Sequence, residues 1–228
     1  MLRESVYEAM KQLLMDHEIE PGARLSIDGL ARELQVSPTP VREALFRCEA
    51  EGLVVRKPNA GYMVAPLIDS IGLNNLYDIR LLLEPVAARR AATLATDAAL
   101  SEMQLHLTSM NVTVPGDTYE AYRDFANRDT QFHGAIAAAA GNPLIADTLD
   151  RLRAHTHGYR LYFRRGVAGD VIGEHTAIMS AILNKEPAAA ERAMYEHLER
   201  SRTRIQSSYP NDTLKRVRRI DNVDRLSL

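Results

Sequence analysis

Two patterns of hydrophobic positions divide this chain near residue 66. Residues 1–66 combine apolar side chains spaced three or four positions apart with two short alternations of apolar and polar residues. Beyond residue 66 the alternation almost disappears, and alanine, leucine, arginine and glutamate dominate. The first spacing predicts helices and the alternation predicts strands. The chain is therefore predicted to be mainly α, with a mixed domain at residues 1–66, a short linker, and an all-helical domain at residues 70–209.

Two short helices separated by a tight turn are predicted within the first domain. The second helix begins after Ser37, a residue type that caps helix N-termini well. Pro38 and Pro40 follow in the first turn, where backbone N–H groups have no partner within the helix. Val41 and Leu45 then repeat at the spacing of a buried stripe. This segment predicts a helix-turn-helix with a rigid start and one polar face.

A β-hairpin is predicted directly after these helices. Residues 53–57 and 61–64 alternate like two strands, and residues 58–60 form a turn-rich connection between them. Helix, turn, helix and hairpin in this order describe a winged helix-turn-helix. A short helix with a polar face and an arginine within reach is what reading of the DNA major groove requires. We therefore expect the domain to bind double-stranded DNA.

Charge limits how that binding can work. Residues 1–66 contain eight Lys or Arg and ten Asp or Glu, a net charge of −2, so affinity must come from a local patch. Few phosphate contacts per copy favour two copies on one site, and hence a homodimer. Residues 200–228 hold eight basic and three acidic residues, a net charge of +5. We interpret the basic tail at 210–228 as a solvated or partly disordered segment, with contact to DNA or a partner as the alternative.

Composition also bounds where the protein works. No apolar stretch approaches the roughly 20 residues that a membrane-spanning helix needs. The single cysteine, Cys48, excludes an intrachain disulfide framework and suits a reducing compartment. We therefore expect a cytoplasmic protein with no membrane association.

The second domain is predicted to be a bundle of about six helices. Its breaks coincide with glycine and proline residues, such as Gly141 and Pro143, which end one helix and start the next. The helices are predicted near residues 69–96, 98–111, 119–140, 143–164, 170–184 and 187–208.

Three histidines and one aspartate form a candidate metal site in this bundle. Asp129 and His133 are four positions apart on one helix, on a face of small or apolar residues. His175 and His197 lie on similar faces of two later helices. Three imidazoles and a carboxylate suit a divalent transition metal. On spacing alone, the pair is more typical of a surface hydrogen bond, and scattered histidines are usually ordinary core or surface residues.

Arg80 is a second candidate, because it lies on a largely apolar helix and its guanidinium needs an anion there. Glu84, one turn later, could be that anion, and a bound carboxylate is the other possibility. Tyr122, Asn127 and Tyr159 are weaker candidates for residues that shape such a pocket.

The first domain resembles the DNA-binding domain of the GntR family of bacterial transcription regulators. Residues 36–45 read VSPTPVREAL, where the family commonly has VSRTPVREAL, and residues 51–54 read EGLV as in related sequences. Pro38 thus stands where arginine is frequent. The resemblance implies that Thr39 and Arg42 contact bases or phosphates and that Gly61 lies at the wing tip near the minor groove. The full set of candidate DNA contacts is Arg32, Ser37, Thr39, Arg42, Arg47, Lys57, Asn59 and Gly61.

The second domain resembles the FCD effector domain of the FadR-like subgroup over roughly residues 70–209. The matching segments are RLLLE at 80–84, DTQFH at 129–133, GNPL at 141–144, EH at 174–175 and MYEHL at 194–198. This resemblance implies a metal held by Asp129, His133, His175 and His197, with zinc the usual ion and nickel or manganese also compatible. It further implies that Arg80 helps to hold a small organic acid that reaches the metal.

Together these features predict a non-enzymatic transcription regulator, a repressor rather than an activator, whose DNA affinity is controlled by a small carboxylate effector. One alternative is a metal-dependent hydrolase with a DNA-binding appendage, because such a metal could activate water. The chain offers no well-supported general base for it, since Glu174 is expected to face away from the neighbouring His175. The other alternative is a regulator whose metal is purely structural.

Overall fold

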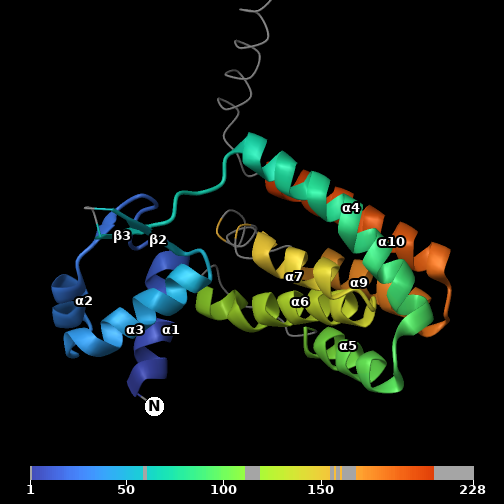
Figure 1. The fold of residues 1–228 in the computed structure, drawn as a ribbon, viewed down its shortest axis with the longest axis horizontal. Helices are drawn as coiled ribbons and strands as arrows, with labels where there is room; N and C mark the ends of the chain where they lie inside the picture. The colour runs from blue at the N-terminus through green and yellow to red at the C-terminus, as the bar shows by residue number, and fades with distance from the viewer. Residues whose placement is uncertain are drawn as a thin grey trace, which may run out of the picture.

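A computed structural model describes residues 2–58, 61–110, 119–154, 157, 160 and 168–207. Within these residues the protein has an N-terminal domain with a small sheet and a second, helical domain (Figure 1). Two of the candidate site residues, Asn59 and Tyr159, lie outside the described residues, as does the basic tail at 210–228. No helix in the described chain is both long enough and apolar enough to cross a membrane.

The N-terminal domain is a winged helix-turn-helix, as the sequence predicts. Its antiparallel sheet has the order β1-β3-β2, with Val54 opposite Val64 and Lys57 opposite Gly61 at the wing. The two-residue strand β1, which pairs with β3, was not predicted because it is too short to show alternation. The elements are α1 (Leu2–Met15), β1 (Arg24–Leu25), α2 (Ile27–Glu33), α3 (Pro38–Ala50), β2 (Val54–Lys57) and β3 (Gly61–Val64).

Helix α3 starts and packs as its sequence predicts. Ser37 is its N-cap residue, and prolines occupy the first turn. The Ser37 hydroxyl makes no capping hydrogen bond, so it is not used to hold the helix start. The buried side of α3 includes Val41, Leu45 and Cys48, each 0% exposed, and it faces the apolar side of α1. This packing leaves the opposite side of α3 in solvent.

The second domain is a helical bundle with six helices among the described residues. Helices α4 and α10 pack side by side along one side of the bundle, and α6 lies against α4, α5 and α7 (Figure 1). Alanine-rich faces of α4 and α6 allow this close approach and share one core with α9 and α10. The helices are α4 (Ser70–Leu94), α5 (Asp97–Ser109), α6 (Tyr119–Ala139), α7 (Pro143–Leu152), α9 (Ala168–Leu183) and α10 (Pro187–Gln206).

The prediction of one helix over residues 143–164 is wrong about where the helix ends. Helix α7 ends at Leu152, because Arg153 adopts the left-handed conformation with φ 48° and ψ 38°. Such a residue breaks the helical hydrogen-bond pattern. Ala154, His157 and Arg160 are helical again beyond this break. Periodicity cannot reveal this break, because no glycine or proline marks it.

Helix α6 ties the two domains together. Its first residue, Tyr119, is 3% exposed and belongs to the core of the N-terminal domain. The Tyr119 backbone N–H donates to Asp16 Oδ1 at 2.6 Å, and Arg123 approaches Glu8 at 3.7 Å. A second contact between the domains involves the linker at residues 65–69, which has no helix or strand. The buried Arg160 donates to the Ala65 carbonyl there, at 2.6 Å. Movement within the bundle therefore has direct routes to the N-terminal domain.

Candidate metal centre

Three buried histidines from three helices meet inside the bundle. His133 comes from α6, His175 from α9 and His197 from α10, and they are 6%, 0% and 4% exposed. One potential ligand atom from each lies within 4.8 Å of the others. The Nε2 atoms of His133 and His175 are 3.2 Å apart. Side chains so far apart in sequence are brought together only by the packing of the bundle.

Asp129 completes the predicted set of four residues. Its Oδ1 atom lies 3.3 Å from His175 Nε2 and 3.8 Å from His133 Nε2. The side chain is buried, one turn before His133 on α6. A carboxylate oxygen and imidazole nitrogens that point at a common centre form a donor set for Zn²⁺, Ni²⁺ or Mn²⁺. The structure thus gathers three of the predicted ligands, His133, His175 and His197, and places the Asp129 carboxylate beside two of them.

Two carboxylates hold the histidine rings in place, a role that was not predicted from the sequence. Glu84 Oε2 lies 2.7 Å from His133 Nδ1, and Glu174 Oε2 lies 2.8 Å from His197 Nδ1. Since a carboxylate only accepts, each Nδ1 carries the proton, and Nε2 keeps its lone pair for a metal. Glu174 does face away from His175, as expected, but toward α10, where it supports His197.

The charges around Glu174 also suit metal binding. Burial alone would raise the pKa of Glu174, but hydrogen bonds from His197 and from Arg204 hold it at about 2. Arg204 donates to both carboxylate oxygens, at 2.7 and 2.9 Å. Burial lowers the pKa of His197 to about 4, against the opposing effect of Glu174. His197 is therefore neutral at pH 7, which is the form that binds a metal.

Arg80 pairs with Glu84 inside the bundle. Its side chain is 4% exposed, and its Nε donates to Glu84 Oε1 at 2.5 Å. Burial alone would raise the pKa of Glu84, but Arg80 and His133 together hold it far below its ordinary value. Glu84 therefore stays ionised and connects Arg80 to the metal centre through His133. A bound effector carboxylate would meet this guanidinium only if further N–H groups of Arg80 remain available.

Of the weaker effector candidates, the structure describes Tyr122 and Asn127, both on α6. Tyr122 is buried, 7% exposed, about two helix turns before Asp129. Asn127 is exposed and borders a groove between the two domains, so we remove it from the candidate contacts at the metal centre. The reason is geometric, since residues two apart on a helix point about 200° apart, and Asp129 takes the inward direction.

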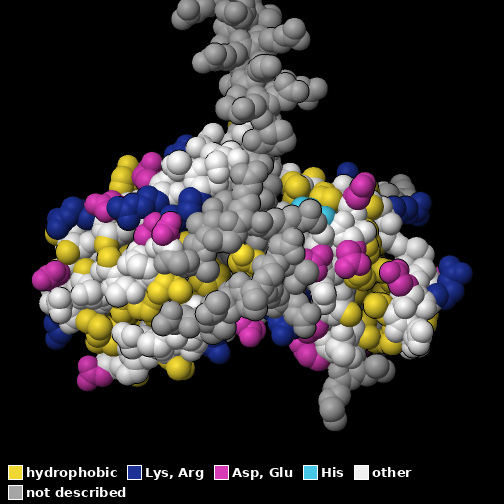
Figure 2. All heavy atoms as spheres, turned by 180° about the vertical axis from the view of Figure 1, so that it is seen from behind, with side chains coloured by type: hydrophobic (Ala, Val, Ile, Leu, Met, Phe, Trp, Pro, Cys, Tyr) yellow, Lys and Arg dark blue, Asp and Glu magenta, His cyan; other side chains and the backbone are white. Residues whose placement is uncertain are grey.

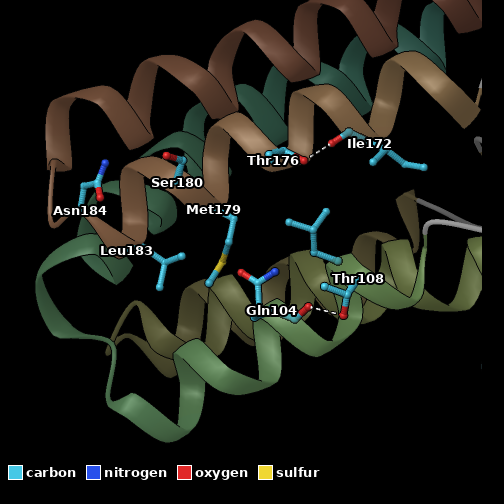
Figure 3. Close-up of a pocket in the computed structure, with 9 residues that line it drawn as sticks. Gln104, Thr108, Ile172, Thr176, Met179, Ser180, Leu183 and Asn184 are labelled. Carbon is cyan, nitrogen blue, oxygen red and sulfur yellow. Dashed lines mark hydrogen bonds between the residues drawn. The ribbon is translucent and has the colours of Figure 1, made fainter.

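A separate pocket of about 280 Å³ lies between α5 and α9 (Figure 3). No charged side chain lines it, and two of its hydroxyls donate to carbonyls of their own helices: Thr108 to Gln104 at 2.9 Å and Thr176 to Ile172 at 2.8 Å. A pocket without a cation does not match a carboxylate effector. The metal centre remains the better candidate.

Most of the predicted DNA contacts are exposed on the N-terminal domain. On the face drawn in Figure 2, acidic and basic side chains are interspersed, which agrees with binding through a local patch. Gly61, with φ 74°, begins β3 at the wing, and an added Cβ would meet nothing within 4 Å. The exposed candidates are Arg32, Ser37, Thr39, Arg42, Arg47, Lys57 and Gly61.

Arg47 was predicted to contact DNA, but in the structure it is engaged within the N-terminal domain. Its guanidinium donates to Glu4 at 2.7 and 3.2 Å and lies 3.6 Å from the centre of the Tyr7 ring. Arg47 therefore faces α1, about 140° around the helix from Arg42, which is five residues earlier. Its role is to fasten α3 to α1, and a sequence pattern alone does not separate these two arginines.

Comparison with known proteins agrees with both domains. Residues 2–64 match the family described as bacterial regulatory proteins, gntR family, and residues 75–200 match the FCD domain. The HTH-type transcriptional regulator LutR of Bacillus subtilis (strain 168) is 30% identical over 209 residues, which cover 82% of this chain and 93% of LutR. The HTH-type transcriptional repressor RspR of Escherichia coli (strain K12) is 27% identical over 200 residues, covering 87% and 86%.

Solved structures support the fold independently. The structure of McbR/YncC from E. coli has a TM-score of 0.66 to this chain at 22% identity, covering 92% of this chain and 99% of that one. A GntR regulator from Rhodococcus sp. RHA1 has the same TM-score at 21% identity. The two domain matches, the relatives and the fold agree. The chain therefore belongs to the GntR family of bacterial transcription regulators, and an FCD domain follows its DNA-binding domain.

Proposed function

We propose that this transcription regulator is a repressor whose operator affinity is set by a small carboxylate effector bound at a metal in the FCD domain. The observation that carries this proposal is the convergence of His133, His175 and His197 in the bundle interior, with the Asp129 carboxylate beside His133 and His175. Zinc fits the donors best, with nickel and manganese as alternatives. The metal would supply a Lewis-acidic position for a carboxylate oxygen, while Arg80 contributes positive charge nearby.

Helix α6 supports a route from this centre to the DNA-binding domain. It carries Asp129 and His133, and it begins at Tyr119 inside the N-terminal core. Asp129 follows Tyr119 by ten positions on this unbroken helix, which corresponds to about 15 Å along its axis. An effector can change operator affinity only by as much as it favours one arrangement of the domains. A shift of α6 on effector binding would supply that difference.

Metal-dependent ligand binding tests the proposal. Small organic acids such as citrate, added to zinc-loaded protein, are expected to raise the melting temperature. At one hundred times Kd the stabilisation would be about 2.7 kcal/mol, or on the order of 5–10 °C. After chelation, or in the His133→Ala variant, the same acids should have no effect.

The alternatives predict other results in that experiment. A purely structural metal would change the melting temperature of the protein without creating any response to acids. The hydrolase is not favoured, and turnover of esters or phosphoesters that the His133→Ala variant loses would be needed to restore it. A regulator of this kind would act in the cytoplasm, where its DNA lies.

We also propose that the protein works as a homodimer on a palindromic operator. Its few exposed cations per copy favour two DNA-binding domains on one site. An exposed apolar stripe on α4 supports a second copy as partner, because Ile71, Leu82 and Val86 are 52%, 67% and 40% exposed. The Leu82→Glu variant is expected to shift the mass in solution from dimer to monomer. Light scattering after gel filtration measures this, with Leu144→Glu, on a 75% exposed leucine of α7, as the matched control.

A further inference from the structure

A groove of about 550 Å³ lies between the two domains, apart from the metal centre. Helices α1 and α3 form one wall, and α6 and α7 form the other. None of the four metal-ligand candidates lines it, although α6 borders both sites. Its volume falls within the range of small-molecule sites, which are frequent at domain junctions.

Basic side chains from both domains line this groove. Lys11 and Arg47 come from the N-terminal domain, and Arg151 and Arg153 come from α7 and its end. The acidic residues that line it are Glu51 and Asp150. Glu51 is already engaged, since Lys11 Nζ lies 2.8 Å from its Oε2 and the Tyr7 hydroxyl donates to its Oε1. Lys11 is thereby paired as well, and Arg47 is bound to Glu4, so the excess of positive charge in the groove comes from Arg151 and Arg153.

The arginines of the second domain have hydrogen-bonding capacity to spare. Arg151 makes no ion pair within the described part of the chain. Arg153 makes one long hydrogen bond, from Nη1 to the Glu49 carbonyl at 3.4 Å. A guanidinium has five N–H donors in a planar fork that suits phosphate and carboxylate oxygens. Most of the donors of these two side chains are therefore available to an anion.

The backbone is arranged to place Arg153 in the groove. Arg153 has the left-handed φ of 48° at a helix end where glycine is usual, which disfavours a side chain there. Opposite it, an added Cβ at Gly52 would come within 3.0 Å of Arg153 Nη1, so glycine leaves room for the guanidinium. The left-handed backbone and the glycine opposite together leave the guanidinium its place at the groove.

The remaining lining residues indicate which other chemical groups a ligand of the groove would have. Asn127 and Gln131 of α6 offer amide groups, and Met15 and Ala50 provide an apolar floor. The Thr130 hydroxyl donates to the Ala126 carbonyl at 2.9 Å, so toward a ligand it can only accept. We propose that the groove binds a small phosphate monoester with a hydroxyl-bearing body, its dianionic phosphate held by Arg151 and Arg153. A ligand that touches both domains would stabilise their present arrangement. It would be a second input to DNA binding, independent of the metal and of its effector.

Calorimetric titration of the full-length protein with glycerol 3-phosphate and with glucose 6-phosphate tests this proposal. We expect saturable binding to wild-type protein that is the same with and without bound zinc. Arg151→Gln and Arg153→Gln should each weaken binding about tenfold or more, as expected for loss of a charge-assisted hydrogen bond. The control is Arg192→Gln, an exposed arginine on α10 outside the groove, which should bind like wild type. Circular dichroism spectra establish that each variant is folded.

Four results would overturn the proposal. Wild-type protein with no saturable binding at millimolar ester is one, and equal affinity in all three arginine variants is another. Binding that disappears when zinc is removed would place the ester at the metal centre instead. Tighter binding of succinate than of either ester, sensitive to Arg151→Gln, would make the groove a dicarboxylate site. Inorganic phosphate serves as a further probe, and we expect it to bind more weakly than the esters because it lacks their hydroxyl-bearing body.

Discussion

The His175→Ala variant is expected to lose almost all affinity for zinc. His175 is fully buried and its Nε2 lies near both Asp129 and His133, so removing it takes a ligand from the middle of the set. The loss should exceed the 10–100-fold that follows when an outer hydrogen-bond partner of a ligand is removed. Metal analysis of purified protein and competition titration with a zinc chelator measure the change.

Two further variants test whether the loss of zinc is specific to a metal ligand. Glu174→Gln keeps the shape of the residue that supports His197 but removes its charge, and we expect the smaller loss of about 10–100-fold. His106→Ala replaces another buried histidine, on α5, and should retain one zinc per chain. Equal zinc content in the His175→Ala and His106→Ala proteins would contradict a metal centre at these residues.

The fold was largely predictable because its signals are local. The proline-started helix α3 and the alternation on both sides of the wing depend on neighbouring residues, and the structure reproduces both. The break at Arg153 was not predictable, because no glycine or proline marks it and its side chain meets a distant part of the chain, at Glu49 and Gly52. Local spacing contains no information about such a contact.

In the candidate site, too, some residues could be predicted from local sequence and others only from the packing. Apolar helix faces made the four ligand candidates noticeable, because buried ionisable groups are costly unless paired or bound to a metal. Their selection as a set depended on the resemblance to the FCD domain, since spacing alone is more typical of ordinary core or surface residues. Glu84 lies 49 positions before His133 and Glu174 lies 23 before His197, so their supporting roles appear only once α4, α6, α9 and α10 are packed. Likewise, only the packing of α1 against α3 separates Arg47, which is bound to Glu4, from Arg42, although both are exposed cations on one helix.

The Arg42→Ala variant is expected to lose most specific binding to operator DNA. Arg42 is exposed on α3, one turn after Thr39, at the end of the helix that would enter the major groove. A bidentate contact from arginine to a guanine contributes about 1–3 kcal/mol of discrimination, and a dimer would lose it twice. Fluorescence anisotropy with a duplex from the promoter region of its own gene measures the loss, with random DNA for comparison.

The salt dependence of binding then separates the possible roles of Arg42. If Arg42 contacts a phosphate, the slope of log K against log salt should fall by about one for each contact removed, and the preference for operator should persist. If Arg42 reads a base, that preference should shrink while the slope changes little. Arg47→Ala is the matched control, because Arg47 lies on the same helix but is bound to Glu4, and its loss should lower stability without changing the slope. Wild-type affinity in the Arg42→Ala protein, or a greater loss in the Arg47→Ala protein, would show that α3 meets DNA through a different face.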